Sequence, residues 1–550
     1  MQAGLTNDEE TYIIIENQRI FWRRKMPERQ KRDPLEVTAR FGNMIMTVYF
    51  LAMTVIFPFY IKDGYREIGK IKAFFFIHIS LITAGIMLTV IAIDFWLQRK
   101  QMSIAAHYRR LSVTDWFVYG YLAAVLLSYL FTDYKKEAFL GAEGWYMGLV
   151  SQLLFVSIYF FFSRFFKWNE KWLCVMLLSS GLVFLWGILN RYSVYPLTIY
   201  EQRPEFISTL GNINWFCGYW TVLSPLGILW YWDSRGGWKQ AAAGIYVVIA
   251  FLSGVTQGSS SAHLALSVIF LMMFCLSFRN NRRMYRFLEL GILFMLSCQL
   301  ARLFRYLPVF TMNYEDKLMN TLTDTNLTLY IGLAIGTVYL LFGYLVKYKN
   351  YEIAKHKEIR NIVMMLLAAA LAGYLALLIA NTCIPGGIPG LSKQQIFVFN
   401  ENWGNSRGAT WLAGLAAYRD MPLLQKLAGV GTDCFAEYIY ALPELAARVY
   451  AQFGDSRLTN AHNEWLTILV NGGALGFVCY AGIFLSAIPR FLKKAQDKPM
   501  LYLCAAGVLA YTVHNMVSFQ QVLNAPFVFM ILGIGEGFFV KEIHLQYSKS

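Results

Sequence analysis

The chain has 550 residues, of which 57% are hydrophobic and 15% carry a charge. Soluble domains contain about a quarter charged residues and at most about half apolar ones, so this composition excludes an ordinary soluble protein and predicts an integral membrane protein. The net charge of +15 could point to nucleic acid. However, the lysines and arginines lie in short loops after alternate apolar stretches, as topology signals do, so we expect no nucleic-acid partner.

The N-terminal segment precedes any long apolar stretch. It combines acidic residues with a basic run from Arg23 to Arg32, and it lacks the pattern of a cleavable signal peptide. We expect a cytoplasmic segment over residues 1–40, with a helix in the membrane interface over Ile13–Trp22. An additional N-terminal pair of transmembrane helices follows within residues 41–113.

Apolar stretches of membrane-crossing length recur along the chain. Windows of about 20 residues predict about 14 transmembrane helices and an all-α fold. Basic loops follow the even-numbered spans from the second to the twelfth, which predicts that both termini are cytoplasmic. The chain then divides into a transmembrane core over residues 114–380 and a C-terminal transmembrane core over residues 464–550. The predicted spans are residues 41–61, 71–96, 114–131, 147–166, 172–190, 214–232, 241–256, 261–278, 288–306, 326–346, 362–380, 464–488, 499–516 and 524–540.

Residues 381–463 form the one long polar segment between apolar stretches. The positive-inside rule places it outside the membrane. Within it, residues 407–420 carry three apolar side chains at helical spacing, which predicts a short amphipathic helix. A second helix is expected over residues 433–451, where Pro443 kinks or splits it. We expect these helices to roof a cavity between the spans, which makes the segment an external catalytic loop.

His462 is the leading candidate for chemistry in this loop. It lies where the polar segment becomes an apolar helix, near the positive end of a helix dipole. That position disfavours the imidazolium and favours a neutral ring, which a base or hydrogen-bond acceptor requires. A histidine that merely caps the helix fits the position equally well.

Several arginines are expected on the same outer side. Each can either reach lipid phosphate or bind a substrate diphosphate through its planar fork of donors. Arg407 is the best candidate for the second role, because it opens a predicted helix whose N-terminal amides also favour an anion. The other candidates for the diphosphate are Arg203, Arg302 and Arg305.

The sequence lacks common signatures of nucleotide and metal chemistry. There is no Walker loop, no GxGxxG between a strand and a helix, no Asp-x-Asp pair and no HExxH. We therefore predict no cofactor and no metal, and a transferase of this kind would receive its activated substrate on a lipid. Cys383 and Cys434 both lie in the external loop, where an oxidising space would allow a disulfide.

Four segments, in order along the chain, resemble the bacterial O-antigen ligase and O-antigen polymerase superfamily. Its members are integral membrane enzymes that act on polyprenyl-diphosphate-linked glycans. The histidine segment and the external-loop segment are fairly specific together, whereas each alone is weak. The segments are WYMG at 145–148, GNINWFCGY at 211–219, SRG at 406–408 followed by PLL and GVG up to residue 431, and HNEWL at 462–466 followed by GGALG.

The resemblance implies a GT-C-like fold and an inverting, metal-independent glycosyl transfer at the outer face of the cytoplasmic membrane. His462 would take a proton from, or orient, the acceptor hydroxyl that attacks the anomeric carbon. Arg407 and Arg203 would hold the donor diphosphate and stabilise the charge that develops on it as it leaves. Glu464 could contact sugar or point along its helix without a catalytic role. The other supporting or sugar-contacting residues would be Asn212, Asn214 and Asn463.

Two features depart from the family's pattern. Residues 258–262 read GSSSA, where the family often has an arginine after a span. The number of predicted spans also exceeds the family's usual dozen, because the pair within residues 41–113 is additional.

Other functions remain open at this point. A ligase would move a finished glycan onto another glycan, a lipid or a protein, whereas a polymerase of the same superfamily would extend the chain. A polysaccharide flippase should show two related halves and ionisable residues at mid-membrane depth, which are not evident here. A peptidoglycan-type polymerase would be expected to place an acidic residue at the centre of its external site. A scaffold that binds glycan without turnover is the fourth alternative.

Overall fold

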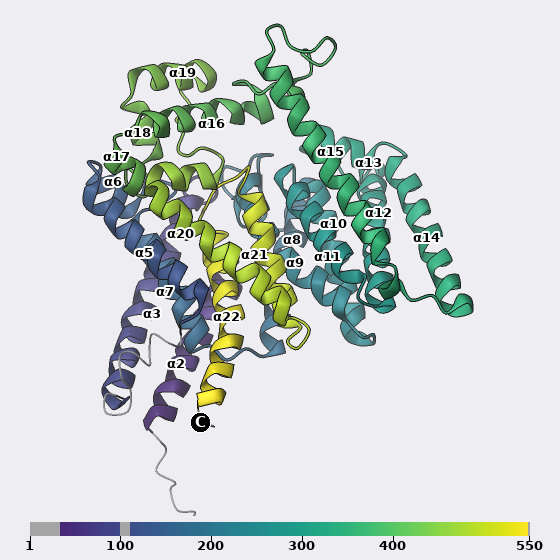
Figure 1. Cartoon of the computed structure of the whole chain (residues 1–550), viewed down its shortest axis with the longest axis horizontal. Helices are drawn as coiled ribbons and strands as arrows, with labels where there is room; N and C mark the ends of the chain where they lie inside the picture. Colours follow the sequence, from purple (N-terminus) through teal and green to yellow (C-terminus); the bar gives the residue numbers. More distant parts are fainter. Residues whose placement is uncertain (1–33, 99–110, 548–550) are drawn as a thin grey trace, which may run out of the picture.

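The computed structural model describes residues 34–98 and 111–547, and the predicted interfacial helix over Ile13–Trp22 lies outside them. The described chain is almost entirely helical (Figure 1). Its only strands are β1 (Phe206–Ile207) and β2 (Gly211–Asn212), which pair antiparallel in one loop. The predicted all-α class is therefore confirmed for the part that is described.

The long helices form an up-and-down bundle. Each predicted span overlaps one of them, because the apolar stretches are long enough to complete many helical turns. They are α2 (Pro34–Leu51), α3 (Ile68–Gln98), α5 (Val113–Phe131), α7 (Leu149–Arg164), α8 (Glu170–Arg191), α9 (Ile213–Asp233), α10 (Trp238–Thr256), α11 (Ser261–Ser277), α12 (Asn281–Tyr306), α14 (Leu327–Lys349), α15 (Lys357–Cys383), α20 (Glu464–Lys494), α21 (Met500–His514) and α22 (Ala525–Tyr547). The first span, residues 41–61, continues beyond α2 through two short helices that end at Phe59.

Nine helices of the described residues are long and apolar enough to cross a membrane, by length and composition. Four further apolar helices, α7, α11, α21 and the Ala525–Val540 part of α22, are shorter. The chain is thus a multi-pass membrane protein. The total of about 14 spans stays a prediction.

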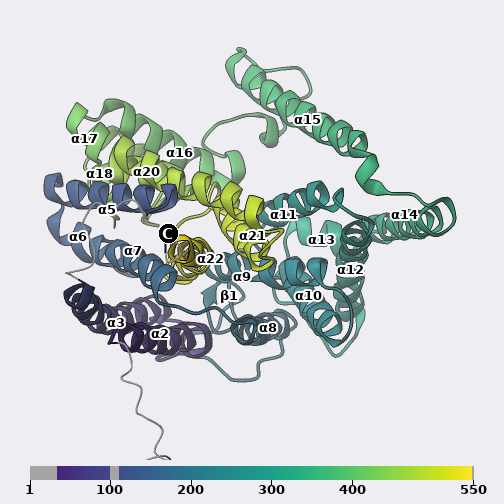
Figure 2. The ribbon, with the colours of Figure 1, turned by 60° about the horizontal axis from the view of Figure 1, so that its bottom comes forward.

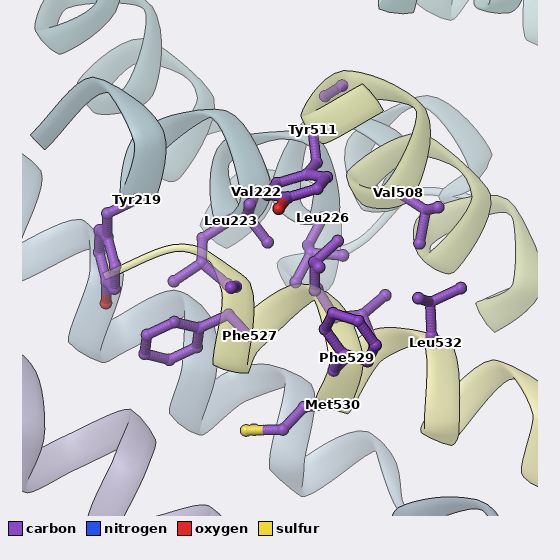
Figure 3. Close-up of a cluster of buried hydrophobic side chains, with 14 of the residues drawn as sticks. Tyr219, Val222, Leu223, Leu226, Val508, Tyr511, Phe527, Phe529, Met530 and Leu532 are labelled. Carbon is purple, nitrogen blue, oxygen red and sulfur yellow. The ribbon is translucent and has the colours of Figure 1, made fainter. Parts of the chain in front are cut away.

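The centre of the bundle is packed around α22. Figure 2 shows this helix surrounded by its neighbours, and Figure 3 shows side chains of α9, α21 and α22 meeting in one cluster. Leu226, Val508 and Phe529 in this cluster are fully buried. Because these helices are apolar on all sides, they can be enclosed by protein and lipid without leaving polar groups unpaired.

Short helices follow α15 and cover one end of the bundle, which we call the capped end (Figure 1). The C-terminus lies at the opposite end. This cap comprises residues 384–463. Its helices are η4 (Gln395–Phe397), α16 (Trp403–Asp420), α17 (Leu423–Ala428), α18 (Phe435–Tyr440) and α19 (Pro443–Phe453). The remaining short helices are η1 (Ala52–Ile56), η2 (Phe57–Phe59), α6 (Lys135–Leu140), α13 (Lys317–Thr323) and η3 (Ile353–Lys355).

The cap agrees with the predicted helices, apart from details that have local causes. The backbone is left-handed at Gly404, Asn405 and Ser406, with φ of 60°, 61° and 66°, so regular helix begins only at Arg407. The predicted helix over 433–451 is split into α18 and α19. Pro443 begins α19, where its missing N–H costs nothing.

The disulfide that the sequence allowed between Cys383 and Cys434 is absent. Cys383 is exposed at the end of α15, whereas Cys434 is buried within the cap, and both are free thiols. The Cys434 sulfur lies 3.4 Å from the carbonyl oxygen of Thr432. This cysteine is therefore a small buried side chain of the cap.

Candidate active site

The candidate site lies where the cap meets the first turn of α20. Thr410 in α16 donates its hydroxyl to the carbonyl oxygen of Ala461, at 2.7 Å. Arg407 precedes Thr410 by one helical turn, and His462 directly follows Ala461. This hydrogen bond therefore brings the segments that carry Arg407 and His462 together at the capped end.

The Arg407 guanidinium is held by backbone carbonyls. Its Nε donates to Val517 O at 3.0 Å, and its Nη1 donates to Gly404 O at 2.9 Å. No carboxylate of the described residues forms an ion pair with it. Burial lowers the pKa of Arg407, although an arginine keeps its proton under all ordinary conditions. A half-buried cation without an acidic partner is well suited to a multi-oxygen anion such as a diphosphate.

The His462 ring lies within range of the positive charge of Arg407. Its backbone is left-handed, with φ of 47°, and its N–H donates to Asn460 Oδ1 at 2.9 Å. The ring meets Phe519 edge to face, with centroids 5.2 Å apart. Burial, and then the positive charge of Arg407, lowers the pKa of His462 to about 4. The imidazole is therefore neutral near pH 7. The main cause of its low pKa is burial, rather than the helix dipole expected from the sequence.

One short loop between α21 and α22 contacts both residues. Val517 in this loop accepts from Arg407, and Phe519 packs on His462. The loop is itself fixed to α20, because Glu464 N donates to Asn515 O at 2.9 Å. From the sequence, these residues are expected only to join two spans.

Glu464 is a buried carboxyl group in the first turn of α20. It is 1% exposed, and its carboxylate accepts hydrogen bonds from Tyr480, Tyr511 and Asn515. The backbone and side-chain contacts to Asn515 together join the start of α20 to the end of α21. Glu464 thus positions the loop that contacts Arg407 and His462, and it also lines the cavity that contains Asp433.

The three asparagines near the site have helix-capping or packing contacts. Asn463 caps α20 by accepting from Leu466 N at 3.1 Å, and Asn212 caps α9 by accepting from Asn214 N at 2.8 Å. Asn214 Oδ1 accepts from Ser259 Oγ at 3.2 Å, within the GSSSA turn that lacks the family's arginine. The capping contacts explain the residue type at positions 212 and 463, because Asn is a favoured N-cap.

The other predicted arginines have partners of their own. Arg305 pairs with Glu315 at 2.6 Å and with Asp324 at 2.9 Å, so a diphosphate would have to displace two carboxylates. Arg302 donates to Asn326 Oδ1 at 2.8 Å. Arg203 is exposed and lies 3.6 Å from Glu201. No contact among the described residues joins any of the three to Arg407 or His462.

Arg191, at the end of α8, is an arginine of the capped end that was not among the predicted site residues. It is fully buried and donates to the carbonyl oxygens of Thr256, Gln257 and Pro204, at 2.8–2.9 Å. Its guanidinium also lies 4.8 Å from the ring centre of Tyr314. Arg191 therefore joins loops of the capped end to one another. In the sequence, a charged residue at the very end of an apolar helix could have indicated this role.

Two glycine motifs of the sequence meet in the structure. α20 breaks at Gly473, where φ is 64°, which frees carbonyl oxygens of the preceding turn. Val430 N then donates to Val470 O at 3.2 Å, and Gly431 N donates to Asn471 O at 3.1 Å. The GVG turn of the cap is thereby docked on the GG break of α20. This contact sets the depth at which the cap sits on the bundle.

Asp433, two residues after this turn, is an acidic group that the sequence analysis missed. Its Oδ2 accepts from Ala142 N at 2.8 Å and from Met147 N at 3.0 Å. Burial raises the pKa of Asp433 to about 7, against the opposing effect of these two hydrogen bonds. An acidic residue two positions after a Gly-x-Gly turn was the pattern that could have marked it.

A cavity of about 50 Å³ lies beside this aspartate. Helices α5, α7 and α20 form its walls, and Asp433, Asn460 and Phe519 lie at its cap side. Phe519 also contacts His462, so the cavity adjoins the candidate base. The predicted arrangement of a cavity under short helices therefore has a counterpart here.

No group of three or more His, Cys, Asp or Glu side chains in the described ranges could hold a metal ion. The sequence prediction of a metal-independent reaction rests on motifs, and it stays a prediction. The chemistry available at the site is that of one neutral imidazole, one guanidinium and the carboxyl groups of Asp433 and Glu464.

Residues 318–481 match the family model described as O-antigen ligase. This part of the chain is similar to that family. The matched part contains Arg407, Asp433 and His462. Arg203, Asn212 and Asn214 lie before it. The resemblance to the O-antigen ligase and polymerase superfamily is thereby confirmed. The match and the apolar helices together indicate a membrane glycosyltransferase-type protein of polysaccharide assembly. No curated protein matches the chain.

Proposed function

We propose that this protein transfers a glycan from polyprenyl diphosphate to an acceptor hydroxyl at the outer face of the cytoplasmic membrane. The observation that carries the proposal is that one loop, residues 515–524, contacts both Arg407 and His462. The same loop thus contacts a cation for the leaving diphosphate and a neutral base for the acceptor, and the charge of the cation acts on that base. The match to the O-antigen ligase family over residues 318–481 supports this reaction class.

In this reaction the acceptor oxygen forms a bond to the anomeric carbon on the face opposite the diphosphate. The bond from that carbon to the diphosphate oxygen breaks, and the diphosphate leaves with the electron pair. His462 accepts the proton of the acceptor hydroxyl. Arg407 stabilises the charge that grows on the leaving oxygen, and a half-buried site strengthens that interaction.

Substrate binding would also tune the base. The charge of Arg407 is one cause of the low pKa of His462. A bound diphosphate would neutralise that charge, so the imidazole would become more basic only when the donor is present. The site would therefore avoid protonation of His462 in the empty state and gain basicity at the moment of transfer.

A deletion strain tests the proposed reaction. Analysis of its lipid-linked glycans and surface polymers should show finished chains left on the carrier if the protein is a ligase. Single repeat units on the carrier would instead favour a polymerase, which is the second candidate within the same superfamily. Carrier-linked glycan of normal length trapped on the cytoplasmic side would contradict both and favour a flippase.

A further inference from the structure

The cavity beside His462 has walls of two kinds. Its volume of about 50 Å³ has room for roughly four water molecules, at roughly 10–15 Å³ each. Aromatic rings of Tyr121, Trp145 and Phe519 line part of it, and Asp433, Asn460 and Asn471 line another part. Asp433 and Asn460 already accept hydrogen bonds from backbone N–H groups, so an apolar ligand would leave Asn471 without a partner. Water alone would not use the rings.

Asn471 is the most informative of the polar residues. It is 6% exposed, and its Oδ1 has no hydrogen-bond partner among the described residues. A buried polar atom without a partner costs about 1–3 kcal/mol, so such an atom in a native protein calls for an explanation. The break of α20 at Gly473 places Asn471 at the last turn before the kink, beside the cavity.

The aromatic rings continue from the cavity to the reacting centre. Phe519 meets His462 with ring centroids 5.2 Å apart, and it meets Trp145 at 4.9 Å. Trp145 in turn meets Trp215 at 5.7 Å. All three pairs are edge to face, a favourable geometry for aromatic rings. A ligand in the cavity is thus separated from His462 by one ring.

A pyranose matches this combination of walls. Its C–H face is apolar and packs on aromatic rings, whereas its rim carries hydroxyls that donate to and accept from carboxamides and carboxylates. The volume fits the hydroxyl-bearing edge of one such ring better than a diphosphate, for which the cavity offers no cationic side chain.

We propose that this cavity binds the hydroxyl-bearing edge of the first sugar of the donor glycan, the one whose anomeric carbon is attacked. The assignment rests on the proposed function, because the donor must place that sugar within reach of both Arg407 and His462. Asn471, Asp433 and Trp145 then determine which sugars the protein accepts, and Arg407 recognises the diphosphate that all donors share.

A binding experiment separates the sugar from the diphosphate. The full chain in lipid nanodiscs is titrated with the lipid-linked glycan that accumulates in a strain lacking the protein, and with bare undecaprenyl diphosphate. The wild type should bind the glycan-bearing carrier about tenfold more tightly than the bare one. Asn471→Leu and Trp145→Ala should reduce this preference to about twofold or less while binding of the bare carrier is unchanged.

Two controls keep the result interpretable. Arg407→Ala should weaken binding of both carriers alike, and Trp238→Ala, which changes an exposed tryptophan at the far end of α10, should alter neither. Asn471→Asp offers a polar variant of similar size in case the leucine variant does not fold. An undiminished preference in folded Asn471 and Trp145 variants would overturn the sugar site alone. Failure of the wild type to bind either carrier would overturn the proposed function, and the sugar site with it.

Discussion

At the level of single residues, the neighbouring charges of the candidate site determine one another. Arg407 keeps its proton throughout, so a second cation beside it is unfavourable, and His462 responds by staying neutral. A bound diphosphate removes that constraint. In the proposed reaction, Arg407 would bind the leaving diphosphate, and the loss of its unpaired charge would make His462 more basic.

This coupling predicts a pH dependence for His462. Burial and Arg407 lower its pKa from 6.5 to about 4, so the folded protein holds the neutral ring as the pH falls from 7 to about 5, and it protonates only below that. Diethyl pyrocarbonate reacts with neutral imidazole, and mass spectrometry of the modified peptide measures its extent. We expect the midpoint of reactivity near pH 4 in the wild type.

The variant Arg407→Gln removes the smaller of the two causes. Its midpoint should rise, yet stay below 6.5, because burial is the larger cause and is unchanged. A wild-type midpoint near the ordinary value for histidine, or no response to Arg407→Gln, would show that the two side chains do not interact.

At the level of elements, the break in α20 and the GVG turn form one structural unit. A methyl group on Gly473 would lie 2.4 Å from the carbonyl carbon and oxygen of Leu427, and the residue already has φ of 64°. Neither a straight helix nor a side chain is compatible with this contact. The cap, the cavity and Asn471 all depend on it.

Gly473→Ala should therefore destabilise the protein by about 1–3 kcal/mol and reduce transfer at least in proportion. Gly476→Ala, one turn further along the same helix, is the matched control, because the nearest atom to its added methyl group is 4.0 Å away. Thermal unfolding in detergent and transfer by membranes measure the two effects. Equal behaviour of both variants would mean that the kink is dispensable.

Sequence patterns could predict most elements but not how they meet. The apolar spans follow from composition, and the split at Pro443 follows from its missing N–H and its preference for a helix start. The contact of Asp433 with the amides of Ala142 and Met147 joins residues almost 300 positions apart, and no periodicity encodes such a pairing.

The same limit explains the arginines. From sequence, Arg305 and Arg407 were both candidates for a diphosphate, since each was expected on the outer side. The structure shows that two carboxylates hold Arg305 and that backbone carbonyls hold Arg407. Both guanidinium groups are charged, but only the one without a carboxylate partner in the described part of the chain is free to pair with a diphosphate. That difference depends on tertiary neighbours, and therefore could not be predicted from spacing in the sequence.

At the level of the whole molecule, α15 connects the bundle to the cap. Figures 1 and 2 show it at the periphery, and none of its most apolar window is buried within the described chain. It ends at Cys383, an exposed free cysteine at the capped end. The predicted topology places this end outside the cell membrane.

A membrane-impermeant maleimide should therefore label Cys383 in cells whose outer permeability barrier has been removed and whose cytoplasmic membrane is intact. The signal should disappear in Cys383→Ser, which leaves the packed interior unchanged because the side chain is exposed. Labelling that requires lysis of the cytoplasmic membrane would reverse the topology and place the candidate site on the wrong side for a lipid-linked donor.

The most direct test of the central claim is glycan transfer by the purified chain in liposomes, with lipid-linked glycan as donor and deletion-strain envelope as acceptor. His462→Ala should lower the rate by at least about a hundredfold, the usual scale of a lost general base, while the protein still inserts and remains monodisperse. His78→Ala, which changes an exposed histidine of α3, should leave transfer unchanged. Wild-type transfer by the His462→Ala protein would contradict the account.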